Sequence, residues 1–338
     1  MKTVLLLTDV NFWERSSGNR ERIYSLVGYL APRVTLTVVN TGPAPSHMEK
    51  VLKPLFNAEF HILETDKYLS SSGYGRRLKK WLSDRKFDAV IIEYIHSTYF
   101  LNYLVNDATI ILDAHDIISD RTEEFRKFNY GGTLHELSAE TESEILKIYD
   151  HVIAICDPDA QRMQALTGAK NILVCPHPIT PVQPTIRQKV KNIVFIASAY
   201  LPNKDAINFF IANCWESISR LYNVQLLIYG TVCEGVNSHG HGNIFLKGFV
   251  PDTSVAYNEA DIIINPVRFG AGLKIKNLEA LARGLPLVTT SHGARGLEAA
   301  RDQAFVIADT PEDFTKAVIS LINDKESRIR LRRSHWAG

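Results

Sequence analysis

The feature that most constrains the fold is an alternation along the sequence between short, β-branched apolar runs and longer stretches of helical periodicity. Short, near-continuous apolar runs predict strands of a parallel sheet covered on both faces. We expect strands in the first half at residues 3–7, 34–39, 88–93, 109–114, 151–155 and 171–175. Amphipathic helices are expected between them at residues 20–30, 78–84, 136–148 and 158–166.

A proline-rich segment at residues 176–191, PHPITPVQPTIRQKVK, has no apolar period and predicts a linker. After it we expect strands at residues 192–197, 224–229, 243–249, 261–265, 285–290 and 304–308, and helices at 204–221, 274–283 and 311–322. The predicted class is therefore α/β, with two Rossmann-like doubly wound domains at residues 1–178 and 190–338 and a linker at 179–189. Ligands in such sheets lie beyond the carboxyl ends of the strands, so two facing domains would form a cleft.

The composition excludes several classes of protein. Among 338 residues, 45% are apolar and the formal net charge is +1, which argues against a general nucleic-acid binder. The four cysteines form no C-x-x-C pair and predict reduced, mostly buried thiols. The first apolar run is too short for a signal peptide, and no stretch approaches the roughly 20 apolar residues that span a bilayer. We expect a cytoplasmic protein, at most peripheral to a membrane.

One stretch, RFGAGLKIKNLEALARGLPLV at residues 268–288, joins a glycine turn to a charged helix start. Its two glycines allow close backbone approach, and free N–H groups at a helix start form an anion site with the helix dipole. Lys274 and Lys276 add two positive charges, which suits a diphosphate, and Glu279 suits the hydroxyls of a ribose. On spacing alone, a lysine–glutamate surface pair on an ordinary helix is an equal alternative.

The longer segment KGFVPDTSVAYNEADIIINPVRFGAGLKIKNLEALARGLPLVTTSHGARGLE closely resembles the donor-binding half of the retaining GT-B glycosyltransferases of family 4, also called glycosyl transferases group 1. Two other segments resemble the family more weakly: LLLTDVNFWERSSGNRERI and ASAYLPNKDAINFF. The resemblance implies the GT-B fold and a reaction that moves a sugar from a nucleotide-diphosphate sugar to a hydroxyl acceptor. It also implies that Glu279 holds the ribose, that the glycine turn holds the diphosphate, and that residues 247–250 flank the base.

Two departures from the family pattern concern the phosphates. The first glutamate of the family's E-x7-E signature is replaced by Ala271, and the basic positions of the first βα turn fall on Ser198 and Asn203, next to Lys204. A branch of the family carries G-x-G-x-K-x-K instead, and this chain resembles that branch. We hypothesise that the positive charge has moved into the lysines of this motif, so that replacing Lys276 with alanine raises the donor KM or abolishes turnover.

Together, the resemblance and the local patterns imply three groups of site residues. The candidate catalytic residues are His115, Lys276 and Glu279. The candidate donor-binding residues are Gly18, Ser198, Asn203, Lys204, Gly248, Phe249, Val250, Arg268, Gly270, Ala271, Gly272, Leu273 and Lys274. The candidate acceptor-binding residues are Ser17, Asn19, Arg20, Asp116 and Arg121. No cofactor is expected beyond the donor, a UDP-, GDP- or dTDP-sugar, and the acceptor is a saccharide or lipid-linked molecule.

The acceptor-side residues lie in SSGNR, at residues 16–20, and LDAHDIISDR, at residues 112–121. Polar residues at the carboxyl end of a strand are good site candidates, and the family commonly has a histidine near the transferred sugar. Considered alone, the first segment is also a common helix N-cap and the histidine a satisfied loop residue. Glu93 and His96, after another strand, are further candidates for the same cleft.

We expect no metal ion. Asp113, His115 and Asp116 superficially suggest a metal cluster, but no second His/Asp group lies nearby in the sequence and the fold does not require one. In the resemblance, transfer proceeds on the front face of the donor sugar, and the leaving diphosphate helps to deprotonate the acceptor. The protein then stabilises charge on the leaving group and positions two substrates.

A basic segment at residues 75–87, GRRLKKWLSDRKF, suggests peripheral contact with anionic lipid in polysaccharide or lipid-linked glycan assembly. The alternative is a solvated helix face. Two other functions stay open: a nucleotide-sugar epimerase on the same fold and a non-catalytic nucleotide-sugar-binding subunit. The first βα turn lacks G-x-G-x-x-G, which argues against a dinucleotide-binding dehydrogenase.

Overall fold

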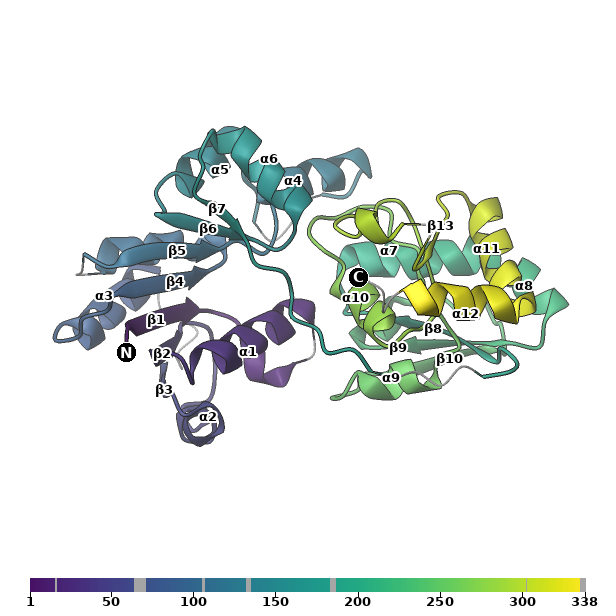
Figure 1. Cartoon of the computed structure of the whole chain (residues 1–338), viewed down its shortest axis with the longest axis horizontal. Coiled ribbons are helices and arrows are strands. Elements are labelled where there is room, and N and C mark those ends of the chain that lie inside the picture. The colour runs from purple at the N-terminus through teal and green to yellow at the C-terminus, as the bar shows by residue number, and fades with distance from the viewer. Residues whose placement is uncertain are drawn as a thin grey trace. The chain divides into compact units, whose positions relative to one another are not determined.

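The computed structural model describes residues 1–15, 17–63, 71–104, 107–131, 135–182, 187–301 and 303–334. The chain divides into two compact units, each a parallel sheet with helices on its faces (Figure 1). The first unit comprises Met1–Arg15 and Asn19–His177, and the second begins at Pro178 and also takes in Ser17 and Gly18. The predicted α/β class with two doubly wound sheets is confirmed.

The first unit is built on a parallel sheet with the strand order β3-β2-β1-β4-β5-β6-β7. The chain runs outward from β1 to β3 and then returns to the other side of β1, so the order reverses between β1 and β4. Ligand sites in such sheets lie beyond the carboxyl ends of the strands at this reversal. The strands are β1 Thr3–Thr8, β2 Thr35–Asn40, β3 Glu59–Ile62, β4 Ala89–Glu93, β5 Thr109–Asp113, β6 His151–Ala154 and β7 Ile172–Val174.

Helices cover both faces of this sheet because alternate strand residues point to opposite sides. Leu6 and Val38 pack against the first two helices, whereas Leu5 and Leu7 pack against the others. The helical elements are η1 Phe12–Glu14, α1 Gly18–Leu30, α2 Met48–Phe56, α3 Ser71–Leu82, η2 Ile95–Tyr103, α4 Ile118–Lys127, α5 Ala139–Leu146 and α6 Asp157–Thr167.

The second unit has the strand order β10-β9-β8-β11-β12-β13, again parallel, with its reversal between β8 and β11. Phe195 and Phe210 belong to the core on one face, and Tyr257 and Leu281 to the core on the other. Its strands are β8 Asn192–Ile196, β9 Gln225–Tyr229, β10 Ile244–Gly248, β11 Ile262–Asn265, β12 Leu287–Thr289 and β13 Val306–Ile307. Its helical elements are α7 Leu201–Phe210, η3 Ile211–Trp215, α8 Glu216–Leu221, η4 Thr231–Gly235, α9 Ser254–Glu259, α10 Ile275–Ala282, η5 Glu298–Ala300, α11 Pro311–Asn323 and α12 Lys325–Ser334.

Every strand that the sequence predicts is present, to within a few residues. Strand β3 was not predicted, because EFHI is short and only alternately apolar and therefore lacks the continuous run of a central strand. Helices α2, α4 and α12 were also missed, since each is short and carries many polar residues. The single helix predicted at residues 204–221 is interrupted by the π-helical turn η3.

Two other expectations bear on the chain as a whole. All four cysteines are free thiols, as predicted, but only Cys156 and Cys214 are buried. Across the described ranges, no helix combines the length and the apolar character needed to cross a bilayer.

Candidate functional site

The predicted donor-binding residues gather at two turns that follow the neighbouring strands β8 and β11. Asn203, in the first turn of α7, donates from Nδ2 to the carbonyl oxygen of Ser198 at 3.1 Å. Its Oδ1 accepts a hydrogen bond from Nζ of Lys276, 73 residues away in sequence, at 2.6 Å. The two turns are also held together by Arg268, which binds both carboxylate oxygens of Asp205 at 2.6 and 3.0 Å. The candidate residues from these two segments therefore form one site in the second unit.

The glycine turn before α10 requires its glycines. Gly270 has φ of 110° and Gly272 has φ of 70°, conformations that other residues rarely adopt. A Cβ atom on Gly270 would lie 3.3 Å from the ring of Pro202, so the backbone here lies close against the first turn. Nζ of Lys274 bends back onto the turn and donates to the carbonyl oxygens of Ala271 and Gly272 at 3.1 and 2.8 Å. This ammonium group consequently stabilises the turn itself.

Lys276 has different surroundings from Lys274. Its Nζ lies 5.1 Å from the centroid of the buried Phe195 ring. Burial, together with the nearby charge of Lys274, lowers the pKa of Lys276 to about 7, whereas Glu279 opposes the shift. A diphosphate bound nearby would favour the charged form, so this lysine is suited to take up a proton as an anion binds.

Glu279 projects from the second turn of α10 toward α9. The hydroxyl of Tyr257 lies 2.7 Å from its Oε2 atom, and the same hydroxyl lies 3.2 Å from the carbonyl oxygen of Lys276. Arg283 donates to the carbonyl oxygen of Glu279 at 3.2 Å and lies 4.5 Å from the centroid of the Tyr257 ring. Tyr257 was not identified from the sequence.

The other donor-side candidates lie at the carboxyl ends of the neighbouring strands. Gly248 ends β10 with φ of 71°, and its carbonyl oxygen accepts from the amide of Gly230, after β9, at 2.7 Å. Phe249 is 53% exposed, which leaves its ring available to a ligand, and Val250 packs on the core beside α9. The side chain of Lys204 runs against η4.

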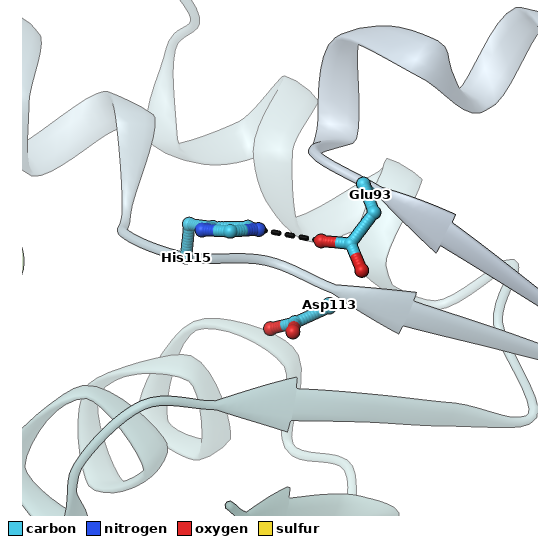
Figure 2. Close-up of side chains that lie close together, drawn as sticks. All are labelled: Glu93, Asp113 and His115. Atoms are coloured by element: carbon cyan, nitrogen blue, oxygen red, sulfur yellow. Dashed lines mark hydrogen bonds and ion pairs between the residues drawn. The ribbon is translucent and has the colours of Figure 1, made fainter. Parts of the chain in front are cut away.

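In the first unit, Figure 2 shows a buried cluster at the carboxyl ends of β4 and β5. Nε2 of His115 lies 2.6 Å from Oε2 of Glu93. Both carboxylate oxygens of Asp113 accept from Arg22 of α1 at 2.9 Å. The ligand-type atoms of the two carboxylates and the histidine lie within 4.8 Å of one another, a spacing that a metal ion could use. The guanidinium group already neutralises Asp113, however, so the donor set suits two ion pairs better than a cation.

The cluster is held in an unusual backbone geometry. Tyr94 and His115 both have positive φ, 68° and 62°, and their rings stack at 4.0 Å. Such conformations cost free energy and persist at sites where the surroundings hold them in place. Burial and the charge of Asp113 raise the pKa of Glu93. Burial alone would lower the pKa of His115, but Asp113 and Glu93 outweigh it and the pKa is raised.

Two of the acceptor-side candidates, Asn19 and Asp116, lie beside this cluster. The side chain of Asn19 hydrogen-bonds with Tyr94, and Asp116 pairs with Arg121 at 2.8 Å. Arg20 pairs with Glu14 at 2.5 Å. Ser17 and the donor-side candidate Gly18 lie at the start of α1 and are grouped with the second unit. The structure thus brings Asn19 and His115 to the same tyrosine.

A second histidine–carboxylate pair lies nearby, and the sequence analysis identified its histidine but not its carboxylate. His96, a further candidate from the sequence, lies 2.9 Å from the carboxylate of Asp9 and stacks on His135 at 4.3 Å. His96 lowers the pKa of Asp9 against the opposing effect of burial. Asp9 directly follows β1, so the rule that selected His115, a polar residue at the carboxyl end of a strand, would also have selected Asp9.

Comparison with known proteins points to a family of glycosyltransferases. Residues 190–324 match the family described as Glycosyl transferases group 1. The chain is 22% identical over 272 residues to an uncharacterised 44.6-kDa protein in the cps region of Klebsiella pneumoniae, a match that covers 72% of this chain and 68% of the relative. It is 23% identical over 218 residues to the poly(glycerol-phosphate) alpha-glucosyltransferase of Bacillus subtilis (strain 168), covering 59% of this chain and only 32% of that relative.

Solved structures share the fold over nearly the whole chain. Sucrose-phosphate synthase from Thermosynechococcus elongatus has a TM-score of 0.75 at 12% identity, with 99% of this chain and 93% of that chain covered. HepE from Anabaena, in complex with UDP-glucose, has a TM-score of 0.73 at 11% identity, with 100% and 94% covered.

The fold is thus that of a GT-B protein, and the family match indicates an enzyme that uses a nucleotide sugar. The chain is a glycosyltransferase, and its residues 190–324 form a glycosyl transferases group 1 domain.

Proposed function

We propose that the enzyme transfers a sugar from a UDP-sugar to a hydroxyl acceptor, with retention of configuration and without a metal ion, in the assembly of a polysaccharide or a lipid-linked glycan. The observation that carries this proposal is the joining of two turns by Lys276 and Asn203, beside Glu279. The complex of HepE with UDP-glucose supports uridine as the base, and the cps region of one relative supports the pathway class.

On the donor side, the diphosphate would lie at the glycine turn, where backbone amides and Lys276 meet it, and the ribose at Glu279. A leaving group of this charge needs stabilisation as the sugar bond breaks, and fixed dipoles and a buried ammonium supply it. On the acceptor side, His115, Asp116 and Arg121 would contact the transferred sugar or the acceptor. The leaving diphosphate would then take the acceptor proton, so that no protein nucleophile is required.

We also propose that the chain belongs to the G-x-G-x-K-x-K branch and that its phosphate-binding charge has moved from the first βα turn to the lysines of this motif. Nζ of Lys276 reaches Asn203, the position where the resemblance places a basic residue of the first turn. The lysine therefore brings its charge to the first turn from the opposite turn. Lys274, by contrast, is engaged with the carbonyl oxygens of its own turn and acts on the phosphates through that turn.

We expect the variant K276A to bind UDP at least about tenfold more weakly, because it loses a charge-assisted contact to the diphosphate. The pKa of Lys276, lowered to about 7, adds a second signature. Above that pH the free lysine is neutral, so UDP binding takes up a proton and the affinity falls as pH rises. K276A should lose this pH dependence in isothermal titration calorimetry.

The exposed Lys316 supplies the control, since K316A removes a lysine whose side chain is 78% exposed. Equal UDP affinity in K276A and wild type would contradict the role of Lys276. The reciprocal variant N203K/K276N, which returns the charge to the first turn, should recover part of the affinity.

Screening UDP, GDP, dTDP and their sugars by thermal shift identifies the donor, and the anomeric configuration of the product in NMR tests retention. Donor that is consumed without an acceptor would favour the epimerase alternative. Binding of UDP without any turnover would favour a non-catalytic subunit.

A further inference from the structure

Tyr257 lies directly beneath the glutamate of the donor site. Its side chain is 1% exposed, and its ring packs in the core between β8, β9 and α10. The hydroxyl is 2.7 Å from Oε2 of Glu279, although 22 residues separate the two in sequence. Burial and the neighbouring carboxylate raise the pKa of Tyr257 well above its usual range, so the hydroxyl keeps its proton and can donate.

A glutamate that binds a ribose needs a hydrogen-bond donor that holds its carboxylate in place. The side chain has several rotatable bonds, and fixing it in one orientation costs conformational entropy when the ligand binds. A bound diphosphate also repels the carboxylate. A buried hydroxyl whose ring is fixed by packing holds the carboxylate in place before the ligand binds, so this entropy cost is not paid on binding. Its hydrogen bond also keeps the carboxylate in position against the repulsion by the diphosphate.

The tyrosine is itself held from two directions. Its ring belongs to the core of the second unit, and the guanidinium group of Arg283 covers it at 4.5 Å. Arg283 also donates to the backbone carbonyl of Glu279, so the same three residues link α9 to the second turn of α10. The orientation of the carboxylate therefore depends on the core of the unit and not only on its own helix.

We propose that Tyr257 is a positioning residue of the donor site, whose hydroxyl fixes the Glu279 carboxylate in the orientation that accepts hydrogen bonds from the ribose. This inference rests on the proposed role of Glu279. Tyr257 itself touches no substrate and acts through the carboxylate.

The test uses isothermal titration calorimetry of the full chain with UDP and with 2′-deoxy-UDP. The variant Y257F removes one hydroxyl and keeps the ring, and we expect it to weaken UDP binding about tenfold, the scale of one hydrogen bond to a charged group. The loss should be clearly smaller for 2′-deoxy-UDP, which lacks one of the hydroxyls that Glu279 binds. In an E279Q background, Y257F should cause little further loss. If the wild type binds GDP and not UDP, GDP and 2′-deoxy-GDP take their places.

The possible results distinguish the role of Tyr257 from the role of Glu279. Unchanged UDP affinity in Y257F, or equal losses for both nucleotides, would overturn the role of Tyr257 while Glu279 keeps its own. Unchanged affinity in E279Q would overturn both. Y222F serves as the control, because the Tyr222 hydroxyl is also hydrogen-bonded in the same unit, accepting from Nδ2 of Asn323 at 2.6 Å.

A second variant covers the case in which Y257F does not fold. E279D leaves Tyr257 in place and draws the carboxylate back by one methylene, out of reach of the hydroxyl. We expect E279D to lose as much UDP affinity as E279Q, and wild-type affinity in E279D would overturn the proposal.

Discussion

At the residue scale, partners distant in the sequence determine the chemistry of single groups. Lys276 has a pKa of about 7 because it is buried beside another lysine and bound to the neutral Asn203. A carboxylate in place of that asparagine would raise the pKa again. The same holds in the first unit, where the carboxylates beside His115 raise its pKa.

Replacing Glu93 with glutamine tests whether this carboxylate raises the pKa of His115. The groups that face His115 are Glu93 and Asp113, which raise its pKa, and Arg22, which lowers it; His177 lies near enough to interact as well. Removing one carboxylate should shift the titration of His115 to lower pH, because its protonated form loses a counter-charge. NMR of histidine-labelled protein measures this directly.

The control for that experiment is E59Q, which removes a carboxylate of β3 that pairs with Arg85. It should leave the His115 titration where it was. An unmoved titration in E93Q as well would mean that Glu93 does not set the protonation of the histidine. Because the folded pKa is raised, the stability that Glu93 confers through His115 is present at low pH and lost as pH rises through the folded pKa.

At the element scale, the site is made where strands β8 and β11 pass through a turn into helices α7 and α10. The two turns meet because β8 and β11 are neighbours in the sheet although β9 and β10 lie between them in sequence. The glycine motif predicts the second turn from the sequence alone, since positive φ is a property of single residues. Which side chains of the first turn it meets follows from strand order, which no local pattern encodes.

The turn itself gives a prediction. In G270A, a residue with a side chain must adopt φ of 110°, and its Cβ atom must lie 3.3 Å from Pro202. We expect a loss of about 1–3 kcal/mol in the free energy of unfolding and weaker UDP binding. Urea denaturation and calorimetry measure the two effects.

Gly242 provides the comparison, because a Cβ atom there meets nothing within 4 Å and its φ is not in the left-handed region. G242A should therefore behave as wild type. If G270A matched G242A in both measurements, the turn would tolerate side chains and its glycines would have no conformational role.

At the scale of the whole molecule, a net charge of +1 conceals an uneven distribution. On α3, Arg76, Lys79 and Lys80 are exposed, while Leu78 is buried in the core of the first unit. The tryptophan expected to anchor this segment in lipid is occupied within the protein: the ring of Trp81 stacks on His61 at 4.5 Å, with Arg85 over it at 3.8 Å. Any attraction of α3 to a membrane would therefore be electrostatic.

This distinction makes the proposed membrane contact testable. The enzyme should sediment with vesicles that contain phosphatidylserine, and salt should release it, because surface electrostatics are screened. The variant R76E/K79E/K80E should stay in the supernatant. R220E/K316E, which reverses two exposed charges in the second unit, should sediment as the wild type does. Equal sedimentation with neutral vesicles would contradict an electrostatic contact.

The sequence alone determined the class of fold and the location of the donor motif, because both depend on local properties: apolar runs form buried strands, and glycines form turns. It missed β3, α2 and α12, where the apolar signal is too short or too diluted by polar residues. Only the tertiary structure paired Lys276 with Asn203, Glu279 with Tyr257, and Asp113 with Arg22, across 73, 22 and 91 residues of sequence. Those contacts depend on which strands are neighbours and on how helices pack, and they set the charges and orientations of the site.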